Sequence, residues 1–171
     1  EPTVVREPVD RGEYIRRLHA MAERFPGDAE VWATLSFHGE AEDRIAAARR
    51  ALALDPAYAD AWQGMAFALR RLGRAREATE AYARCREVAP TATDCATDLA
   101  SLELAEGRCD AMLATGRALA AVAPDAPATY VTLSQALASL GAPREAVEAT
   151  VRQRAAHVTP PSARAMHEGF D

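Results

Sequence analysis

The sequence predicts an all-α fold, an α-solenoid in which antiparallel helix pairs are stacked in 34-residue repeats. Four glycines recur at intervals of 34 residues, and a proline follows each of the first three after 17 residues. Alanine, the strongest helix former, is the most abundant residue type, whereas aromatic residues make up only 6% of the chain. A repeat of this length with a helix on each side of a glycine is typical of helix–turn–helix arrays. The glycines are Gly39, Gly73, Gly107 and Gly141, and the prolines are Pro56, Pro90 and Pro124.

Two segments are expected before the repeats, and one after them. Residues 1–10 contain Pro2 and Pro8 and are expected to form an extended arm. Residues 11–26 are predicted to form a helix that caps the N-terminal end of the stack, because their apolar side chains recur at helical spacing. The tail, residues 159–171, opens close to two prolines and shows no periodicity, so it is expected to be irregular.

The first repeat, residues 27–58, is predicted to have a shortened first helix. Trp32 precedes Gly39 by seven residues, whereas Trp62 precedes Gly73 by eleven. The missing residues amount to about one turn of α-helix. The favoured interpretation is an eroded terminal repeat, since end repeats are often atypical. The alternative is a notch that admits a ligand.

Three full repeats are predicted to follow, at residues 59–92, 93–126 and 127–158. Gly73 and Gly107 are expected to take the left-handed conformation that ends a helix. Glycine adopts this conformation without the steric cost that other residues meet.

The second repeat carries a recognisable series of residues on its two helices. They are Trp62, Met65, Ala66, Leu69, Ala78, Tyr82 and the closing Pro90. This series resembles the tetratricopeptide repeat family. The third repeat departs from the pattern at Ala96, Glu103 and Gly116, and the fourth departs at Val158, which replaces the closing proline. The resemblance implies a right-handed solenoid whose concave face, made mostly by the first helix of each pair, binds a protein or peptide.

The resemblance also places the candidate partner-binding residues on the first helices, beside the residues that pack between helices. Phe67 is followed by Arg70 and Arg71, and arginine forks can hold a carboxylate through two hydrogen bonds. The favoured alternative for the two arginines is a solvated helix end. The full set is Thr34, Phe37, Gln63, Phe67, Arg70, Arg71, Thr97, Asp98, Ser101, Thr132 and Gln135.

One binding mode of the family is excluded. Some tetratricopeptide domains hold the C-terminal carboxylate of heat-shock chaperones with lysine and asparagine side chains. This chain contains neither residue type, and two of the matching positions hold Asp94 and Asp98, which repel a carboxylate.

The three cysteines leave two interpretations open. Cys85 lies near the end of one predicted helix and Cys95 near the start of the next, so a disulfide between them is conceivable. Free thiols are favoured, because Cys85 occupies a position where the family often has alanine. Cys109 begins the following helix at the opposite end of its pair. No two cysteines have the spacing of zinc ligands, so no metal site is predicted.

Composition and motifs argue against several classes of function. A net charge of −5 opposes nucleic-acid binding, and no segment is apolar for long enough to insert into a membrane. No signal peptide is visible, so a cytoplasmic location is expected. The sequence contains no catalytic motif or phosphate loop, and neither catalysis nor a cofactor is expected. Ser36, His38 and Glu40 form the only trio that suggests a nucleophile, base and orienter, and they are interpreted as a polar loop.

The leading hypothesis is a non-catalytic scaffold that binds a protein or peptide. A second hypothesis is a regulatory segment of a larger multidomain bacterial protein, for example a serine/threonine kinase. A third is self-assembly through the last helix, residues 143–157. That helix carries Val147, Val151 and Ala155 on a face that no further repeat covers, whereas the end of a solenoid normally needs a polar outer face.

Overall fold

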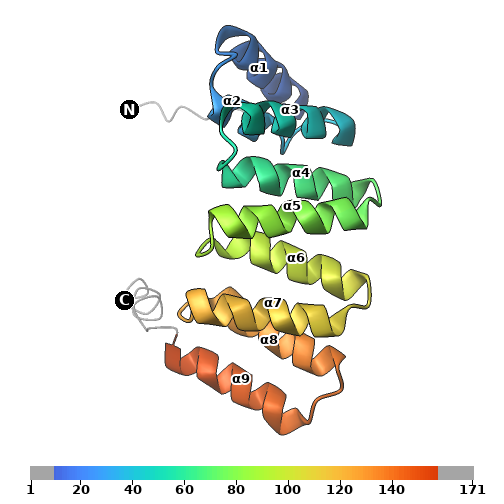
Figure 1. The fold of residues 1–171 in the computed structure, drawn as a ribbon, viewed down its shortest axis with the longest axis vertical. Helices are drawn as coiled ribbons and strands as arrows, with labels where there is room; N and C mark the ends of the chain where they lie inside the picture. The colour runs from blue at the N-terminus through green and yellow to red at the C-terminus, as the bar shows by residue number, and fades with distance from the viewer. Residues whose placement is uncertain (1–9, 158–171) are drawn as a thin grey trace, which may run out of the picture. The chain divides into compact units, whose positions relative to one another are not determined.

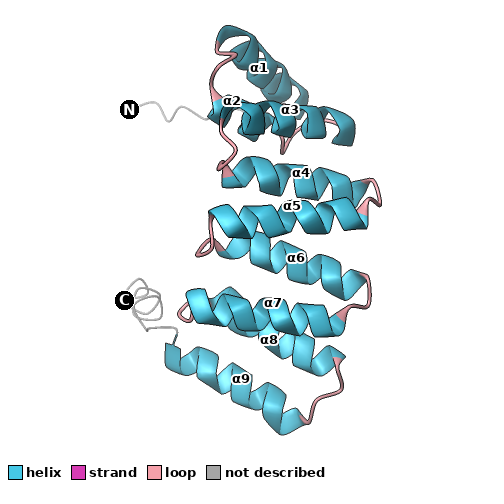
Figure 2. Ribbon diagram, in the orientation of Figure 1, coloured by secondary structure: helices cyan, strands magenta, loops and turns pink. Residues whose placement is uncertain are grey.

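The computed structural model describes residues 10–157, and every regular element within this range is a helix (Figure 1, Figure 2). The predicted all-α fold is confirmed, whereas arm residues 1–9 and the tail at 159–171 lie outside the described residues. No described helix is long and apolar enough to cross a membrane. The chain divides into two compact units, one ending at Val88 and one beginning at Ala89. The first contains α1 (Arg11–Arg24), α2 (Ala29–Leu35), α3 (Ala41–Leu54), α4 (Ala59–Arg71) and α5 (Ala75–Val88), and the second contains α6 (Thr93–Ala105), α7 (Cys109–Val122), α8 (Pro127–Ser139) and α9 (Arg144–His157).

In the first unit each helix packs against the next, and α2 also contacts α4. α1 is capped by Asp10, whose Oδ2 accepts a hydrogen bond from the amide of Glu13 at 3.2 Å. This bond satisfies one of the amides that a helix start leaves without a partner. The apolar face of α1 packs against α2 and α3, and together they form a hydrophobic cluster. The buried members of the cluster are Leu18, Ala22, Val31, Leu35 and Ala47.

α2 is the shortest of the described helices. It has seven residues, whereas α4, α6 and α8 have 13 each. Residues 36–39 turn where the longer helices continue. Gly64 of α4 lies directly against this turn, because a Cβ built on Gly64 would stand 2.7 Å from the Cβ of Ser36. The end of α2 therefore rests on the middle of α4 with no room for a side chain between them.

The glycines of the 34-residue period end helices in the left-handed conformation, which confirms the prediction for Gly73 and Gly107. Their φ angles are +71° and +69°, and the other two glycines of the period also have positive φ. At Gly73 the amide of Arg74 donates to the carbonyl of Leu69, and the amide of Gly73 donates to that of Arg70, both at 3.0 Å. These two bonds satisfy carbonyls that the helix end would otherwise leave unpaired.

The two tryptophans explain a second interval in the sequence. Trp32 and Trp62 each follow a proline by six residues, and each indole Nε1 donates to the carbonyl of that proline. The distances are 3.0 Å to Pro26 and 2.9 Å to Pro56. The six-residue interval is thus the reach of an indole N–H back to the loop that precedes its helix.

In the second unit, α6 to α9 pack in sequence, and α6 also contacts α8. Two residues of this unit that depart from the repeat pattern, Glu103 and Gly116, make specific contacts. Glu103 is 5% exposed and accepts a hydrogen bond from Thr115 Oγ1 at 2.9 Å. Gly116 lets α8 approach α7 closely, because a Cβ there would lie 2.9 Å from Leu133 Cδ2. A buried carboxylate with a hydroxyl donor, and a glycine with a close leucine, replace the usual aromatic residues.

Candidate binding site

Phe67 on α4 lies beside two guanidinium groups. Arg70, one turn later on α4, places its Cζ 5.2 Å from the centroid of the Phe67 ring. Arg44 of α3 places its Cζ 5.0 Å from the same centroid. Both distances fall within the roughly 6 Å over which a cation is attracted to an aromatic face. Phe67 and Arg70 are only partly buried, so both side chains remain accessible, whereas Arg44 is buried beside the ring.

Arg44 reaches Phe67 over the end of the short helix α2. Its Nε donates to the backbone carbonyl of Ser36 at 2.8 Å, and in a longer helix a backbone amide would use that carbonyl. Only 5% of Arg44 is exposed. Steps of 34 residues from Arg44 lead to Ala78 and Met112, which are both buried and uncharged. A charged side chain thus occupies a position that is apolar in the next two repeats.

Further positive charges surround Arg44. Burial, followed by the charges of Arg71 and Arg11, lowers the pKa of Arg44. Burial and the charges of Arg11 and Arg44 also lower the pKa of His38, so its imidazole is neutral at neutral pH. We call Arg11, Arg44, Arg70 and Arg71 the arginine cluster.

No member of the arginine cluster forms an ion pair with a carboxylate within residues 10–153. Other arginines of the first unit do form such pairs. Arg74 contacts Glu77 at 2.5 Å, and Arg16 and Arg17 contact Glu13 at 2.9 and 2.8 Å. The cluster therefore carries positive charge that no carboxylate in the described part of the chain neutralises by direct contact.

A pocket of about 430 Å³ opens beside the arginine cluster, where the start of α1, the α2–α3 turn and the end of α4 meet. Two arginines, two glutamates and two aliphatic side chains give its walls a mixed character. These residues are Arg11, Ile15, Glu40, Glu42, Arg71 and Leu72. The pocket can therefore receive a segment that carries both a charged group and an apolar one.

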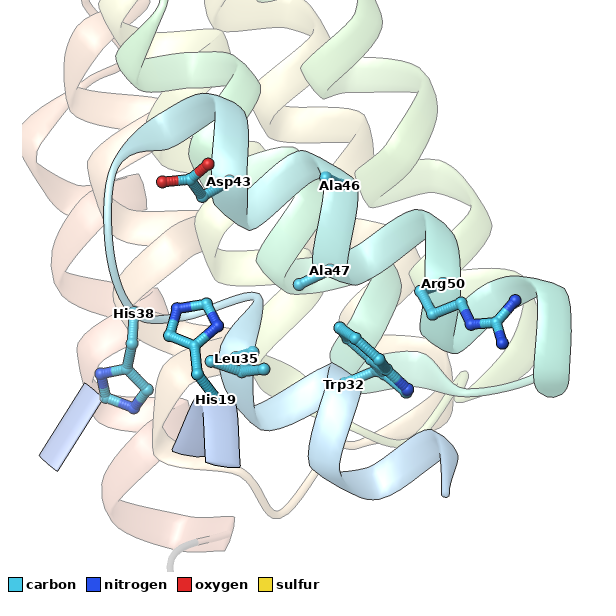
Figure 3. Close-up of a pocket in the computed structure, with 8 residues that line it drawn as sticks. All are labelled: His19, Trp32, Leu35, His38, Asp43, Ala46, Ala47 and Arg50. Carbon is cyan, nitrogen blue, oxygen red and sulfur yellow. The ribbon is translucent and has the colours of Figure 1, made fainter. Parts of the chain in front are cut away.

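A second pocket, of about 310 Å³, lies among α1, α2 and α3 (Figure 3). Figure 3 shows the Trp32 ring and the Leu35 side chain between α2 and α3, with His19 beside Leu35. Asp43 and Arg50 of α3 add polar groups to its rim. Within the described residues, no three His, Cys, Asp or Glu side chains gather in a way that could hold a metal ion.

Solved structures share this arrangement of helices. One is TTC0263, described as a thermophilic TPR protein in Thermus thermophilus. It matches with a TM-score of 0.65 at 14% identity, over 92% of this chain and 88% of that one. This chain has the tetratricopeptide-repeat fold. A MamA protein matches with a TM-score of 0.70 at 16% identity, over 90% of this chain and 86% of that one.

A third structure, Naa15/Naa10 bound to HypK-THB, matches the tetratricopeptide-repeat fold with a TM-score of 0.60 at 18% identity. The match covers 88% of this chain but 23% of that one. No protein-family model and no curated protein sequence matches the chain. At these identities the likeness establishes the fold alone.

Six of the predicted partner-binding residues belong to the first unit of this tetratricopeptide-repeat fold. Five of them are partly exposed, and the sixth, Arg71, is exposed. The structure adds Arg44, which lies beside Phe67, and Arg11, which lines the adjoining pocket. Thr34 lies on α2 and Phe37 in the turn after it, whereas Gln63, Phe67, Arg70 and Arg71 lie on α4.

The other five predicted residues lie in the second unit: Thr97, Asp98 and Ser101 on α6, and Thr132 and Gln135 on α8. The prediction for Thr132 is wrong. Its residue is 3% exposed, and its Cγ2 lies 3.3 Å from where a Cβ on Gly116 of α7 would stand. Thr132 therefore packs between helices and cannot contact a partner. That the remaining residues of the two units share one binding surface stays a prediction.

Sequence reasoning missed Arg44 and Arg11. A signal for Arg44 was present, because the 34-residue register places an arginine where the following repeats have an alanine and a methionine. No comparable signal marks Arg11, which joins the site only because α1 begins beside the α2–α3 turn.

The trio of Ser36, His38 and Glu40 does not form a nucleophilic arrangement. Ser36 is fully buried, and its Oγ donates to the carbonyl of Ala33 at 2.6 Å. The His38 ring instead makes an edge contact with Tyr14, with the ring centroids 5.0 Å apart. Ser36 therefore differs from the expected polar loop, because its hydroxyl is buried and bonded to the end of α2.

The sequence favours free thiols at Cys85 and Cys95, but among the described residues only Cys109 is a free cysteine, so that interpretation is not supported. The pairing of Cys85 with Cys95 stays a prediction. Both side chains are buried, whereas Cys109, at the start of α7, is a free and partly exposed thiol. Peptide mapping by mass spectrometry without reductant tests the pairing. A cross-linked peptide that dithiothreitol separates is the expected result, and alkylation of all three cysteines in the unfolded, unreduced protein would contradict it.

Proposed function

We propose that this chain is a non-catalytic scaffold that binds a protein or peptide partner through the first helices of its tetratricopeptide-repeat fold. The observation that supports this most directly is Phe67, a partly exposed aromatic ring beside Arg44 and Arg70. Aromatic and arginine side chains are the residues most enriched among those that dominate binding energy at protein interfaces.

The chemistry of the surrounding surface also supports binding rather than catalysis. Gln63 and Arg71 place polar groups next to Phe67 on α4, and a pocket opens beside Arg71. A polar surround with an aromatic centre is the usual composition of a protein interface. One protein with a similar fold, Naa15/Naa10, is described as bound to HypK-THB.

Affinity capture followed by a binding measurement tests the proposal. The wild-type chain is used as bait, captured proteins are identified by mass spectrometry, and the leading partner is purified and titrated by calorimetry. Phe67→Ala and Arg71→Glu are expected to weaken binding by at least about tenfold, as loss of a central interface residue does. Arg76→Ala, an exposed arginine of α5, serves as the matched control. Unchanged affinity in both test variants would show that the α4 surface is not the binding site.

Self-assembly is a second candidate, favoured by one observation. Val151 of α9 is 53% exposed, the highest value among the exposed large hydrophobic side chains of the described residues. Light scattering over a wide range of protein concentration distinguishes the candidates. Mass that rises with concentration in the wild type but not in Val151→Glu supports self-assembly, whereas a monomer throughout removes it.

A further inference from the structure

The position of Arg44 calls for a physical explanation. Arg44 is 5% exposed, and burying a guanidinium carries a desolvation cost, which hydrogen bonds and an opposite charge normally offset. Here Nε alone donates to a protein acceptor, the carbonyl of Ser36. The terminal nitrogens make no hydrogen bond within the described residues, and neither is sealed from solvent. Donors are therefore left for a group from outside.

The neighbours of Arg44 add positive charge, which makes the site more favourable for an anion. Arg71 and Arg11 are close enough for their charges to act on Arg44, and Arg70 contacts the same Phe67 ring. Two carboxylates, Glu40 and Glu42, line the adjoining pocket, but neither forms an ion pair with the cluster. Four guanidinium groups against two rim carboxylates leave the site positive.

We propose that the arginine cluster binds a carboxylate side chain, Asp or Glu, of a partner peptide, with an adjacent aliphatic residue of that peptide against Ile15 and Leu72. This inference rests on the proposed function, because it names the chemistry of the segment that the scaffold receives. Planar guanidinium forks match carboxylate geometry, and the aliphatic walls of the pocket accept the neighbouring side chain. The rim glutamates favour a single carboxylate over a group of higher charge, such as phosphate.

The short helix α2 is what makes this site. Because α2 ends at Leu35, the Ser36 carbonyl is open to Arg44, and Arg44 can pass from α3 to the Phe67 ring of α4. In the next repeat the corresponding residue is Ala78, which is fully buried. The site therefore favours the notch interpretation of the first repeat over simple erosion.

Fluorescence anisotropy with designed peptides tests the inference. The probe is a labelled Gly–Ser peptide with a central Glu-Leu, and the matched probes carry Gln-Leu or phosphoserine-Leu. The wild-type chain is expected to bind the Glu peptide saturably and at least about tenfold more tightly than the Gln peptide. A tenfold change in Kd is about the free energy that one hydrogen bond to a charged group contributes. Tighter binding of the phosphoserine peptide would overturn the preference for carboxylate.

Two variants connect the binding to the cluster. Arg44→Met introduces the residue found at the corresponding position of the third repeat, Met112, and Arg71→Ala changes an exposed side chain that the fold does not need. Each is expected to weaken binding of the Glu peptide by about tenfold, with Arg76→Ala unchanged. Thermal unfolding followed by circular dichroism verifies that each variant is folded, and Arg71→Ala decides the question if Arg44→Met is not.

The outcomes separate this inference from the proposed function. Equal binding of the Glu and Gln peptides, binding of neither, or full affinity in Arg71→Ala would overturn the carboxylate site. If partner capture still depends on Phe67 in that case, the scaffold function stands without it. If the Glu peptide binds as expected but captured partners ignore Phe67→Ala and Arg71→Glu, the carboxylate site stands and the proposed partner surface is wrong.

Discussion

The contact between Gly64 and Ser36 predicts that Gly64→Ala destabilises the first unit, although the substitution improves helix propensity. Gly64 lies within α4 and is buried against the turn that follows α2. An alanine Cβ would collide with both Oγ and Cβ of Ser36, and it would lie 3.2 Å from the carbonyl carbon of that residue. No side-chain rotation can move these atoms away together, so one of the two helices must shift.

Two opposing effects set the magnitude of this change. Replacing glycine by alanine inside a helix stabilises it by about 1 kcal/mol when no contact is disturbed. Forcing extra volume into a packed site costs about 1–3 kcal/mol, and sometimes more. Because the collision involves a Cβ and a backbone carbon, the upper part of that range applies. We therefore expect a net loss of about 2 kcal/mol in the free energy of unfolding.

Urea denaturation followed by circular dichroism measures this loss in Gly64→Ala, in Ser36→Gly and in the double variant. Ser36→Gly removes Oγ and Cβ together, so the double variant should lose less stability than the two single variants combined. Gly27→Ala is the control, because no atom lies within 4 Å of where its Cβ would stand. If Gly64→Ala is as stable as the wild type or more stable, the close contact of α2 with α4 is wrong.

Three further predictions concern helix ends, titration and the buried carboxylate. Gly73→Ala should cost about 1–2 kcal/mol by thermal unfolding, because a φ of +71° strains an L-residue while no atom obstructs the new Cβ. Burial and two neighbouring arginines lower the folded-state pKa of His38, so its contribution to stability is present above the unfolded pKa and is lost as pH falls through the folded value. Unfolding curves between about pH 7 and pH 5 should therefore show a smaller loss of stability in His38→Gln than in the wild type. Thr115→Val removes a hydrogen bond to the buried Glu103 carboxylate and should cost about 1–3 kcal/mol by urea denaturation, whereas unchanged stability would show that Thr115 is dispensable.

The fold could be predicted because its signals are local. Glycine is strongly favoured where a helix ends in the left-handed conformation, so Gly73 and Gly107 mark helix ends in the sequence itself. The interval between Pro56 and Trp62 was visible as well, but its cause was not. It is a hydrogen bond from an indole to a loop carbonyl, and only the path of the chain shows that the two groups meet.

The candidate site was less predictable, because it depends on how closely helices approach one another. Thr132 was expected on the surface of α8, but Gly116 allows α7 and α8 to come so close that Thr132 is covered. Arg44 was overlooked for the converse reason. Its position in the repeat is normally apolar, and the buried Arg44 joins the site only because α2 stops early.

The hydrogen bond between Thr115 and Glu103 also bears on how a repetitive chain chooses its own partners. Helices of similar length and shape can pair in the wrong order, and repeat proteins are prone to such misassembly. If the second helix of another repeat took the place of α7, the position of Thr115 would be filled by Ala81 or Ala149. Neither can donate a hydrogen bond to the buried carboxyl group, so the exchanged pairing would lose the bond that Thr115 makes. One polar pair thus distinguishes the correct pairing of α6 with α7 from pairings with helices of similar length and shape.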